Sequence, residues 1–215
     1  MNAAGVQQRI NRGWGIAAHK LGEVCDQRRP WQAVNPLGNE ARMGWPMAYF
    51  DPDFRFQGLK PNLYGKPIFG VGMDRRGARI GDYLIAPSGT YFLAGMQPLL
   101  PTIGVQCNVT VTVTRPGGTM QPGINTYAGR TNATDMVLMQ GWPASVLTGG
   151  RTQAGRADLP SDVPDKGSQM LMPYWPGVIL RTSDRVSDDQ GRAFNINAAE
   201  LSDLGWRCDL VLSTA

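Results

Sequence analysis

The sequence predicts a mainly β protein with two small antiparallel β-barrel or sandwich units from an internal duplication, preceded by a short N-terminal helix and an extended arm. Three observations carry this prediction: a wealth of turn-forming residues, strand patterns in both halves, and landmarks that recur in the same order. The chain of 215 residues holds 27 Gly and 16 Pro, which implies much turn and loop structure. Its length suits one large or two small domains.

The N-terminal region reads as a helix followed by irregular chain. Between Ala3 and Leu21 no proline occurs, and apolar residues such as Val6, Ile10 and Trp14 recur at spacings of three and four, which indicates an amphipathic helix. From residue 22 to 66 Pro, Gly, Asn and Asp are too dense for regular helix. We expect an extended arm there, ordered against other subunits.

Strand patterns begin after the arm. Residues 81–85 and 90–94 are apolar-rich and flank Pro87-Ser88-Gly89, a pattern typical of a hairpin. Residues 108–115 alternate valine with polar residues, which predicts a strand with one buried and one solvated face. Shorter apolar runs at 135–139 and 144–147 indicate further strands.

An internal repeat organises these patterns. Three sets of landmarks pair at offsets of 97, 102 and 101 residues: Gly44-Trp45-Pro46 with Gly141-Trp142-Pro143; Asp82, Gly89 and Phe92 with Asp184, Gly191 and Phe194; Gly104 and Cys107 with Gly205 and Cys208. Because tryptophan and cysteine are scarce in this chain, their joint register favours a duplication over recurrent hairpin chemistry.

The repeat sets the domain boundaries. We expect a helix and arm at 1–42, a first β-rich repeat at 43–117, a linker at 118–134 and a second repeat at 135–215. Trp45 and Trp142 are the candidate packing anchors, since they hold equivalent places before a proline. Cys107 and Cys208 are expected at equivalent buried positions. Cys25, which lies among polar residues, is expected to be exposed.

No catalytic or metal-binding constellation is visible. The single histidine, His19, lies in the helical segment without a neighbouring acid or thiol. The three cysteines form no C-x-x-C pair, which argues against a zinc cluster or a disulfide framework. Asp184, Asp188 and Asp189 fit a polar turn better than a cation cage, and Asp51 and Asp53 flank a proline. We expect no enzyme activity and no cofactor.

Charge is uneven along the chain. Through Ile80 there are twelve Lys and Arg against six Asp and Glu, and beyond it nine against eleven. Arg75, Arg76 and Arg79 form the densest basic cluster and are candidate contacts for a protein partner or a DNA channel; a solvated loop is the alternative. No apolar run is long enough to cross a membrane, and the N-terminus lacks a secretory signal. We therefore expect a protein made and kept in a cytoplasm.

Residues 79–97 and 106–116 carry a family resemblance. Their motifs are a "G-D-hydrophobic" strand at Gly81, a "Gly-x-Tyr-hydrophobic" strand at Gly89 and a "C-N-x-x-V-x-V-x-R"-like strand at Cys107. This pattern resembles the head-completion or stopper proteins at the neck of tailed bacteriophages. The resemblance implies a structural virion protein that forms a homo-oligomeric ring between portal and tail, contacts portal or adaptor and tail proteins, and lies near DNA.

Two alternatives remain open. The first alternative to a neck protein is another phage tail component, such as a tail terminator. The second is a β-module that binds glycans or cell surfaces. For glycan binding, Trp31, Trp45, Trp142 and Trp175 would have to form a stacking platform.

Overall fold

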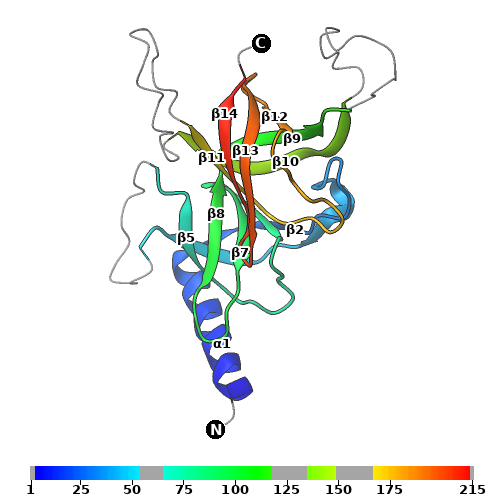
Figure 1. The fold of residues 1–215 in the computed structure, drawn as a ribbon. Helices are drawn as coiled ribbons and strands as arrows, with labels where there is room; N and C mark the ends of the chain where they lie inside the picture. Colours follow the sequence, from blue (N-terminus) through cyan, green and yellow to red (C-terminus); the bar gives the residue numbers. More distant parts are fainter. Residues whose placement is uncertain (1–2, 54–64, 118–134, 149–166, 214–215) are drawn as a thin grey trace, which may run out of the picture.

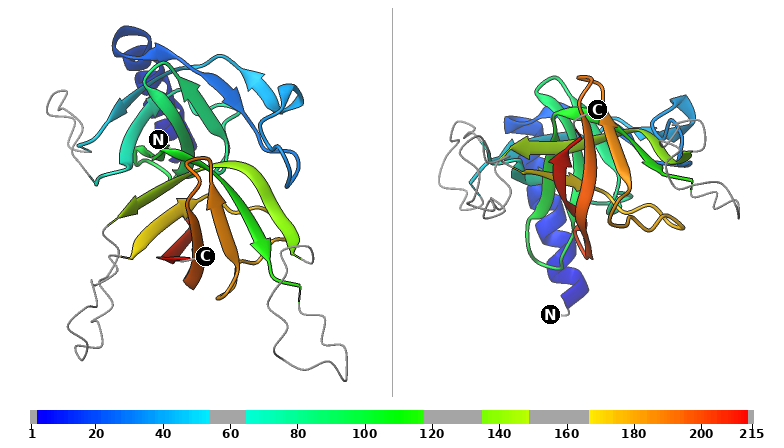
Figure 2. Two further views of the ribbon diagram at one scale, coloured as in Figure 1. Left: turned by 90° about the horizontal axis from the view of Figure 1, so that it is seen from above. Right: turned by 45° about the horizontal axis from the view of Figure 1, so that its top comes forward.

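The computed structural model describes residues 3–53, 65–117, 135–148 and 167–213. It confirms the predicted mainly β fold: one helix docks on the first of two β units, and the chain termini lie at opposite ends of the molecule (Figure 1). The two units lie next to each other when the molecule is viewed from above (Figure 2).

Helix α1 spans Ala3–Leu21, as the apolar spacing predicted. It packs against β4 and β5 of the first unit. Ala18 is buried, and the ring of Trp14 lies 6.2 Å from that of Tyr49. His19 and Lys20 occupy the last turn, where positive charge interacts favourably with the helix dipole. Docking on the sheet thus supports a helix that Gly13 and Gly15, both in its middle turns, would weaken in isolation.

The first unit is an eight-stranded antiparallel sheet with neighbour order β1-β4-β5-β8-β7-β6-β2-β3. Its strands are β1 (Glu23–Val24), β2 (Asp26–Arg28), β3 (Arg42–Gly44), β4 (Met47–Asp51), β5 (Ile68–Met73), β6 (Tyr83–Ala86), β7 (Gly89–Gly95) and β8 (Thr102–Cys107), with a 3-10 turn at Asn39–Ala41. Only Cys25 separates β1 from β2, and only Trp45 and Pro46 separate β3 from β4. Because β1 pairs with β4 and β2 with β3, the sheet curls into an open half-barrel.

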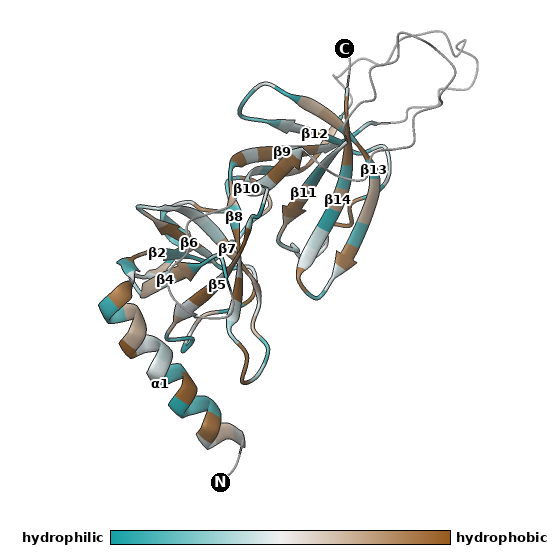
Figure 3. Ribbon diagram, turned by 90° about the vertical axis from the view of Figure 1, so that its left-hand side faces the viewer, coloured by the Kyte–Doolittle hydropathy of each residue, from teal (hydrophilic) through white to brown (hydrophobic). Residues whose placement is uncertain are grey.

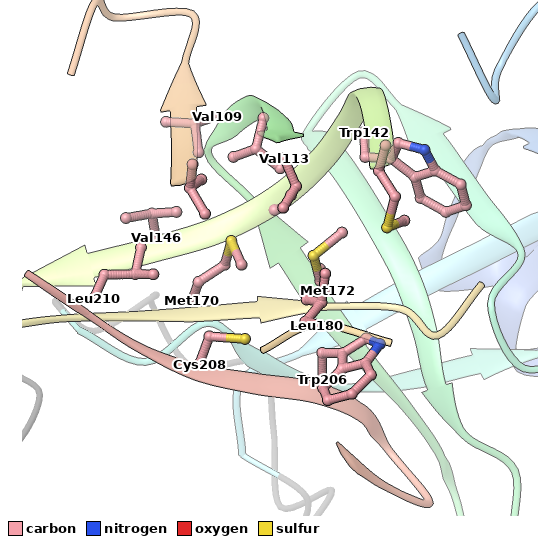
Figure 4. Close-up of a cluster of buried hydrophobic side chains, with 14 of the residues drawn as sticks. Val109, Val113, Trp142, Val146, Met170, Met172, Leu180, Trp206, Cys208 and Leu210 are labelled. Carbon is pink, nitrogen blue, oxygen red and sulfur yellow. The ribbon is translucent and has the colours of Figure 1, made fainter. Parts of the chain in front are cut away.

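The second unit is a closed six-stranded barrel with order β10-β11-β14-β13-β12-β9. Its strands are β9 (Val109–Arg115), β10 (Met136–Thr148), β11 (Ser168–Met172), β12 (Arg185–Asp188), β13 (Ala193–Ser202) and β14 (Gly205–Leu212). The valine alternation predicted for β9 is confirmed: Val109, Val111 and Val113 are buried, and the intervening threonines are half-buried. These valines pack in the barrel with Met170, Met172 and Leu210 (Figure 4).

The two units share one topology. If β1–β2 is counted as one strand and β3–β4 as the next, the first unit has six successive strands, like the barrel. In both units the second strand pairs with the third, the third with the sixth, the sixth with the fifth, the fifth with the fourth and the fourth with the first. Cys107 and Cys208 lie on the sixth strand of their units, but Cys107 ends its strand and is half-buried, whereas Cys208 is central and buried, so the predicted equivalent burial holds only for the choice of strand.

A repeated ion pair strengthens the equivalence. In the first unit the buried carboxylate of Asp82 accepts hydrogen bonds from Nε and Nη2 of Arg29 at 2.7 and 2.8 Å, and from the backbone N–H of Arg79. Nη2 of Arg29 also donates to the carbonyl of Gly77. The acid precedes β6, and the arginine directly follows β2.

The second unit repeats each of these bonds. The buried carboxylate of Asp184 accepts from Nε and Nη2 of Arg115, both at 2.8 Å, and from the backbone N–H of Arg181. Nη2 of Arg115 donates to the carbonyl of Ile179, five residues before the acid, as Gly77 is in the first unit. We name these the Asp82 clamp and the Asp184 clamp. Their identical layout supports a duplication rather than two unrelated barrels.

Strand pairing places the unit boundaries differently from the sequence prediction. Residues 23–44, expected as part of an arm, supply β1, β2 and β3 of the first sheet, and β9 belongs to the second barrel rather than to the first repeat. The short strands β1 to β3 escaped detection because two or three residues show no period-two pattern. The expected linker at 118–134 and the polar stretch at 149–166 lie outside the described residues.

The two units pack on each other. Only Asn108 separates β8 from β9, and one hydrophobic cluster takes buried residues from both units. The hydroxyl of Tyr83 donates to the carbonyl of Pro143 at 2.8 Å, and the indole N–H of Trp142 donates to the carbonyl of Ala33 at 2.7 Å. Figure 3 shows the first unit, with α1, and the barrel following one another along the molecule.

Candidate interaction surfaces

The basic cluster predicted from sequence is not one surface. Arg75 is only 8% exposed, and its Nη1 donates to the carbonyls of Gln97 and Leu100 at 3.0 and 3.2 Å. Its Nε donates to Asn11 of α1 at 3.2 Å, and burial lowers the pKa of the guanidinium. Arg75 therefore ties α1 to the β7–β8 connection, and its burial removes it from the exposed basic cluster that the sequence predicted.

The other two members of the cluster remain at the surface. The side chain of Arg76 is 82% exposed and forms an ion pair with Asp74 at 2.6 Å. Asp74, in turn, has its pKa lowered by the hydrogen bond from Arg76. Arg79 is exposed, and its backbone N–H belongs to the Asp82 clamp. Of the predicted trio, Arg76 and Arg79 therefore stay on the surface.

A basic surface that the sequence reading missed lies on α1. The helix carries no Asp or Glu, and Arg12, His19 and Lys20 are exposed on it. Arg12 and His19 line one side of a cleft between α1 and the β5–β6 connection. Arg76 and its ion-pair partner Asp74 line the other side. We call Arg12, His19, Lys20 and Arg76 the helix face. The absence of acidic residues across the helical segment was the available signal.

The tryptophans do not form a shared platform. Trp142 is fully buried and its ring lies 5.6 Å from that of Trp175, whereas Trp31 and Trp45 are 49% and 63% exposed. A stacking platform for glycans requires all of its rings at one surface, and Trp142 lies inside the protein. Trp142 has the burial expected of a packing anchor, but Trp45 does not, which corrects the prediction made for it.

An apolar cleft separates parts of the two units. It measures about 570 Å³ and is lined from the first unit by Ile80, Gly81 and Leu93. From the barrel it is lined by Tyr174, Leu204 and neighbours in the β13–β14 turn. Ile80, Tyr174 and Leu204 are 55%, 46% and 41% exposed. Exposed apolar groups gathered in this way are typical of a surface that contacts another protein.

The cysteines are free thiols within the fold. Cys208 is buried, as expected, while Cys107 is half-buried and packs against the main hydrophobic cluster. Cys25 is fully buried between β1 and β2, which corrects the expectation of exposure. Burial raises the pKa of Cys25 to about 12, with the charge of Glu23 adding to the effect. Burial likewise raises the pKa of Cys208 to about 12.

Slow thiol chemistry follows from this burial. Because the thiolate is the reactive form, we expect Cys25 and Cys208 of the native protein to resist Ellman's reagent at pH 8, and to react promptly in denaturant. Mass spectrometry of alkylated peptides identifies which thiols react. Rapid labelling of Cys25 in the native protein would contradict its placement in the sheet.

The acidic residues singled out in the sequence form structural contacts. Asp184 belongs to its clamp, and Asp188 accepts hydrogen bonds from Gln190 and Arg192 within the β12–β13 turn. Asp51 is buried and caps the backbone N–H of Asp53. Within the described residues no group of three or more His, Cys, Asp or Glu side chains is placed to hold a metal ion.

Comparison with known proteins adds no relative: no family model, curated protein or solved structure matches the chain. Among the described residues, no helix combines the length and apolarity that crossing a membrane requires.

Proposed function

We propose that this chain is a non-enzymatic structural protein of a tailed bacteriophage, located at the neck between portal and tail. The observation that carries the proposal is the tandem of two equivalent β units with interaction surfaces on the outside. The helix face, the apolar cleft and the exposed Trp45 are features of a protein that works by contacting other subunits. The motifs around Gly81, Gly89 and Cys107 connect this architecture to neck proteins.

The helix face supports a contact with an acidic virion protein. The cations Arg9, Arg12 and Lys20 lie on α1, which carries no Asp or Glu, and the opposite side of the helix packs on the sheet through Trp14 and Ala18. Exposed Ile16 and Leu21 accompany these charges, and a mixed basic and apolar surface fits a protein better than a phosphate backbone. Charges at such a contact steer assembly and fix its register.

Inactivating the gene in a phage that encodes this chain tests the proposal. The expected lysate contains DNA-filled heads and free tails that remain unjoined, because a neck protein completes the head for tail attachment. Expression of the native chain in trans should restore tailed particles. Normal numbers of infectious, tailed particles without the protein would overturn the neck assignment.

Charge reversal on the helix face gives a finer prediction for the same complementation assay. We expect the double variant Arg12→Glu, Lys20→Glu to fold, since exposed charges contribute less than about 1 kcal/mol each to stability. It should nevertheless restore at most about a tenth of the tailed particles, because like charges now face each other across the contact.

The matched control is Arg181→Glu, which reverses an exposed charge on the second unit. Its backbone N–H, rather than its side chain, serves the Asp184 clamp, so folding and complementation should both be retained. Equal complementation by the double variant and the native chain would remove the helix face from the account.

A further inference from the structure

The guanidinium of Arg75 is buried without a matching acid. The residue is 8% exposed. Its Nε donates to Asn11, and its Nη1 donates to the carbonyls of Gln97 and Leu100, whereas Nη2 has no acceptor among the described residues. Burial is what lowers the pKa of this group. Because a buried charge is stable only when it is paired and fully hydrogen-bonded, Arg75 is left incompletely satisfied.

Among the described residues no acid pairs with Arg75. Its neighbour in the sequence, Asp74, pairs with Arg76 at 2.6 Å, and Asp82 pairs with Arg29. Segments 54–64 and 118–134 contain no Asp or Glu. The acids within 149–166 belong to the connection between β10 and β11 of the barrel. A counter-charge for Arg75 is therefore to be sought outside the first unit.

The β7–β8 connection beside Arg75 is fixed in an unfavourable conformation. Leu99 has a φ of 63°, in the left-handed region that residues with a side chain rarely adopt. Its backbone N–H donates to Oε1 of Gln7 at 2.7 Å, and Arg75 holds the carbonyls of Gln97 and Leu100. Strain of this kind persists only where the surroundings impose it, and it is common at ligand-binding sites. Leu99 and Leu100 are left 49% and 52% exposed.

Helix α1, Arg75 and this connection enclose a cleft of about 460 Å³. We call it the Arg75 cleft. The residues that line it include Gln7, Asn11, Arg75, Met96, Pro98 and Leu99. One guanidinium thus lies among amide and apolar groups. A carboxylate is the group that the planar fork of an arginine recognises best, and apolar walls strengthen such a pair by excluding water.

We propose that the Arg75 cleft binds an acidic side chain of a partner protein, with its carboxylate on Nη2 of Arg75 and apolar neighbours of that acid against Leu99 and Leu100. The cleft that Arg12 and His19 line also includes Gln7 and Asn11, so a partner on the helix face lies next to the Arg75 cleft. The inference deepens the proposed function, on which it rests only for the partner being a virion protein.

A nucleic acid fits the Arg75 cleft less well than a protein does. Binding to a phosphate backbone relies on several exposed cations. The cleft instead offers one guanidinium, 8% exposed, beside the side chains of Met96, Pro98 and Leu99. A flexible acidic side chain with apolar neighbours matches both features.

Binding of the full-length protein to two sets of immobilised peptides tests the proposal. One set carries a central Glu between apolar residues, the other carries Gln in its place, and both termini of every peptide are blocked. The assay uses about 0.15 M salt, which screens attraction to exposed cations. The native protein should bind the Glu set at least about tenfold more tightly than the Gln set, because only Glu forms a charged pair with Arg75.

Two variants at Met96 locate this binding without removing the hydrogen bonds of Arg75. Met96→Glu places a carboxylate in the cleft, where it competes with the peptide, and should weaken binding to the Glu set at least about tenfold relative to Met96→Gln, which has the same shape without the charge. Arg181→Gln removes an exposed charge from the second unit and should bind as the native chain does. Circular dichroism verifies that each variant is folded.

Arg75→Gln should abolish the preference for the Glu set, but it also releases the β7–β8 connection, so the comparison at Met96 decides. Equal binding of the two peptide sets by the native protein, equal binding of the Glu set by the two Met96 variants, or displacement of the Glu peptides by a short DNA duplex overturns the inference. Glu-dependent binding by a chain absent from purified particles would overturn the neck assignment and leave the cleft standing. A neck protein that does not distinguish the two sets would do the reverse.

Discussion

Trp142→Ala is expected to lower the free energy of unfolding by about 3–5 kcal/mol, the usual cost of emptying a buried tryptophan site. The ring is fully buried in the cluster shared by both units, and its N–H satisfies the carbonyl of Ala33. The change therefore removes core packing and one hydrogen bond between units. Equilibrium denaturation in urea, followed by circular dichroism, measures the loss.

The duplicate residue provides the control for this experiment. Trp45→Ala should cost the isolated chain less than about 1 kcal/mol, because the ring is 63% exposed and little packing is lost. The comparison is made at a protein concentration at which both variants are monomeric, so that assembly does not contribute to stability. Equal costs for the two tryptophans would contradict the environments described above.

Arg115→Ala is the second large effect. It leaves the carboxylate of Asp184, which is 2% exposed, without the two bonds from Nε and Nη2. Removing one partner of a buried ion pair costs about 3–5 kcal/mol, because the remaining charge is left unpaired away from water. We expect about 3 kcal/mol, since the side chain of Arg115 is itself 27% exposed and water can partly replace it.

The duplication supplies a matched comparison for the clamp. Arg29→Ala should have a smaller effect than Arg115→Ala, because Asp82 keeps a hydrogen bond from the side chain of Gln27 at 2.8 Å, whereas among the described residues Arg115 is the one side chain that donates to Asp184. Arg207→Ala is the control for losing an exposed pair, since Arg207 and Glu200 are 56% and 64% exposed, and it should cost less than about 1 kcal/mol. A loss that small for Arg115→Ala would show that the clamp is not structural.

The sequence predicted the fold class because its signals are local. The valine alternation of β9, the hairpin around Gly89 and the apolar spacing of α1 each describe one element that packs on a single face. The duplication was also visible, although the reading used Asp82 and Asp184 and overlooked that Arg79 and Arg181 precede them by three residues. That spacing marks the backbone bond of each clamp, whereas the side-chain donors Arg29 and Arg115 lie 53 and 69 residues from their acids in the sequence.

Burial of individual side chains was less predictable because it depends on tertiary partners. Trp45 and Trp142 share the same tripeptide, but Trp142 pairs with the buried Val111 and lies inside the fold, whereas Trp45 precedes the residue, Pro46, that meets buried Cys25. Arg75 lies in a basic run of the sequence that suggests a surface residue. Its guanidinium is nevertheless buried, because it donates hydrogen bonds to Asn11 on α1 and to the carbonyl of Gln97 in the β7–β8 connection. Cys25 sits among polar residues in the sequence, but it lies between β1 and β2 in a buried cluster with Ala48 and Leu84.

Cryo-electron microscopy of purified particles tests the central claim most directly. The account predicts that the chain is present in the particle and that density between portal and tail accommodates a ring of copies, each with two β units and one helix. Absence of the chain from purified particles, or density that places it away from the neck, would contradict the account.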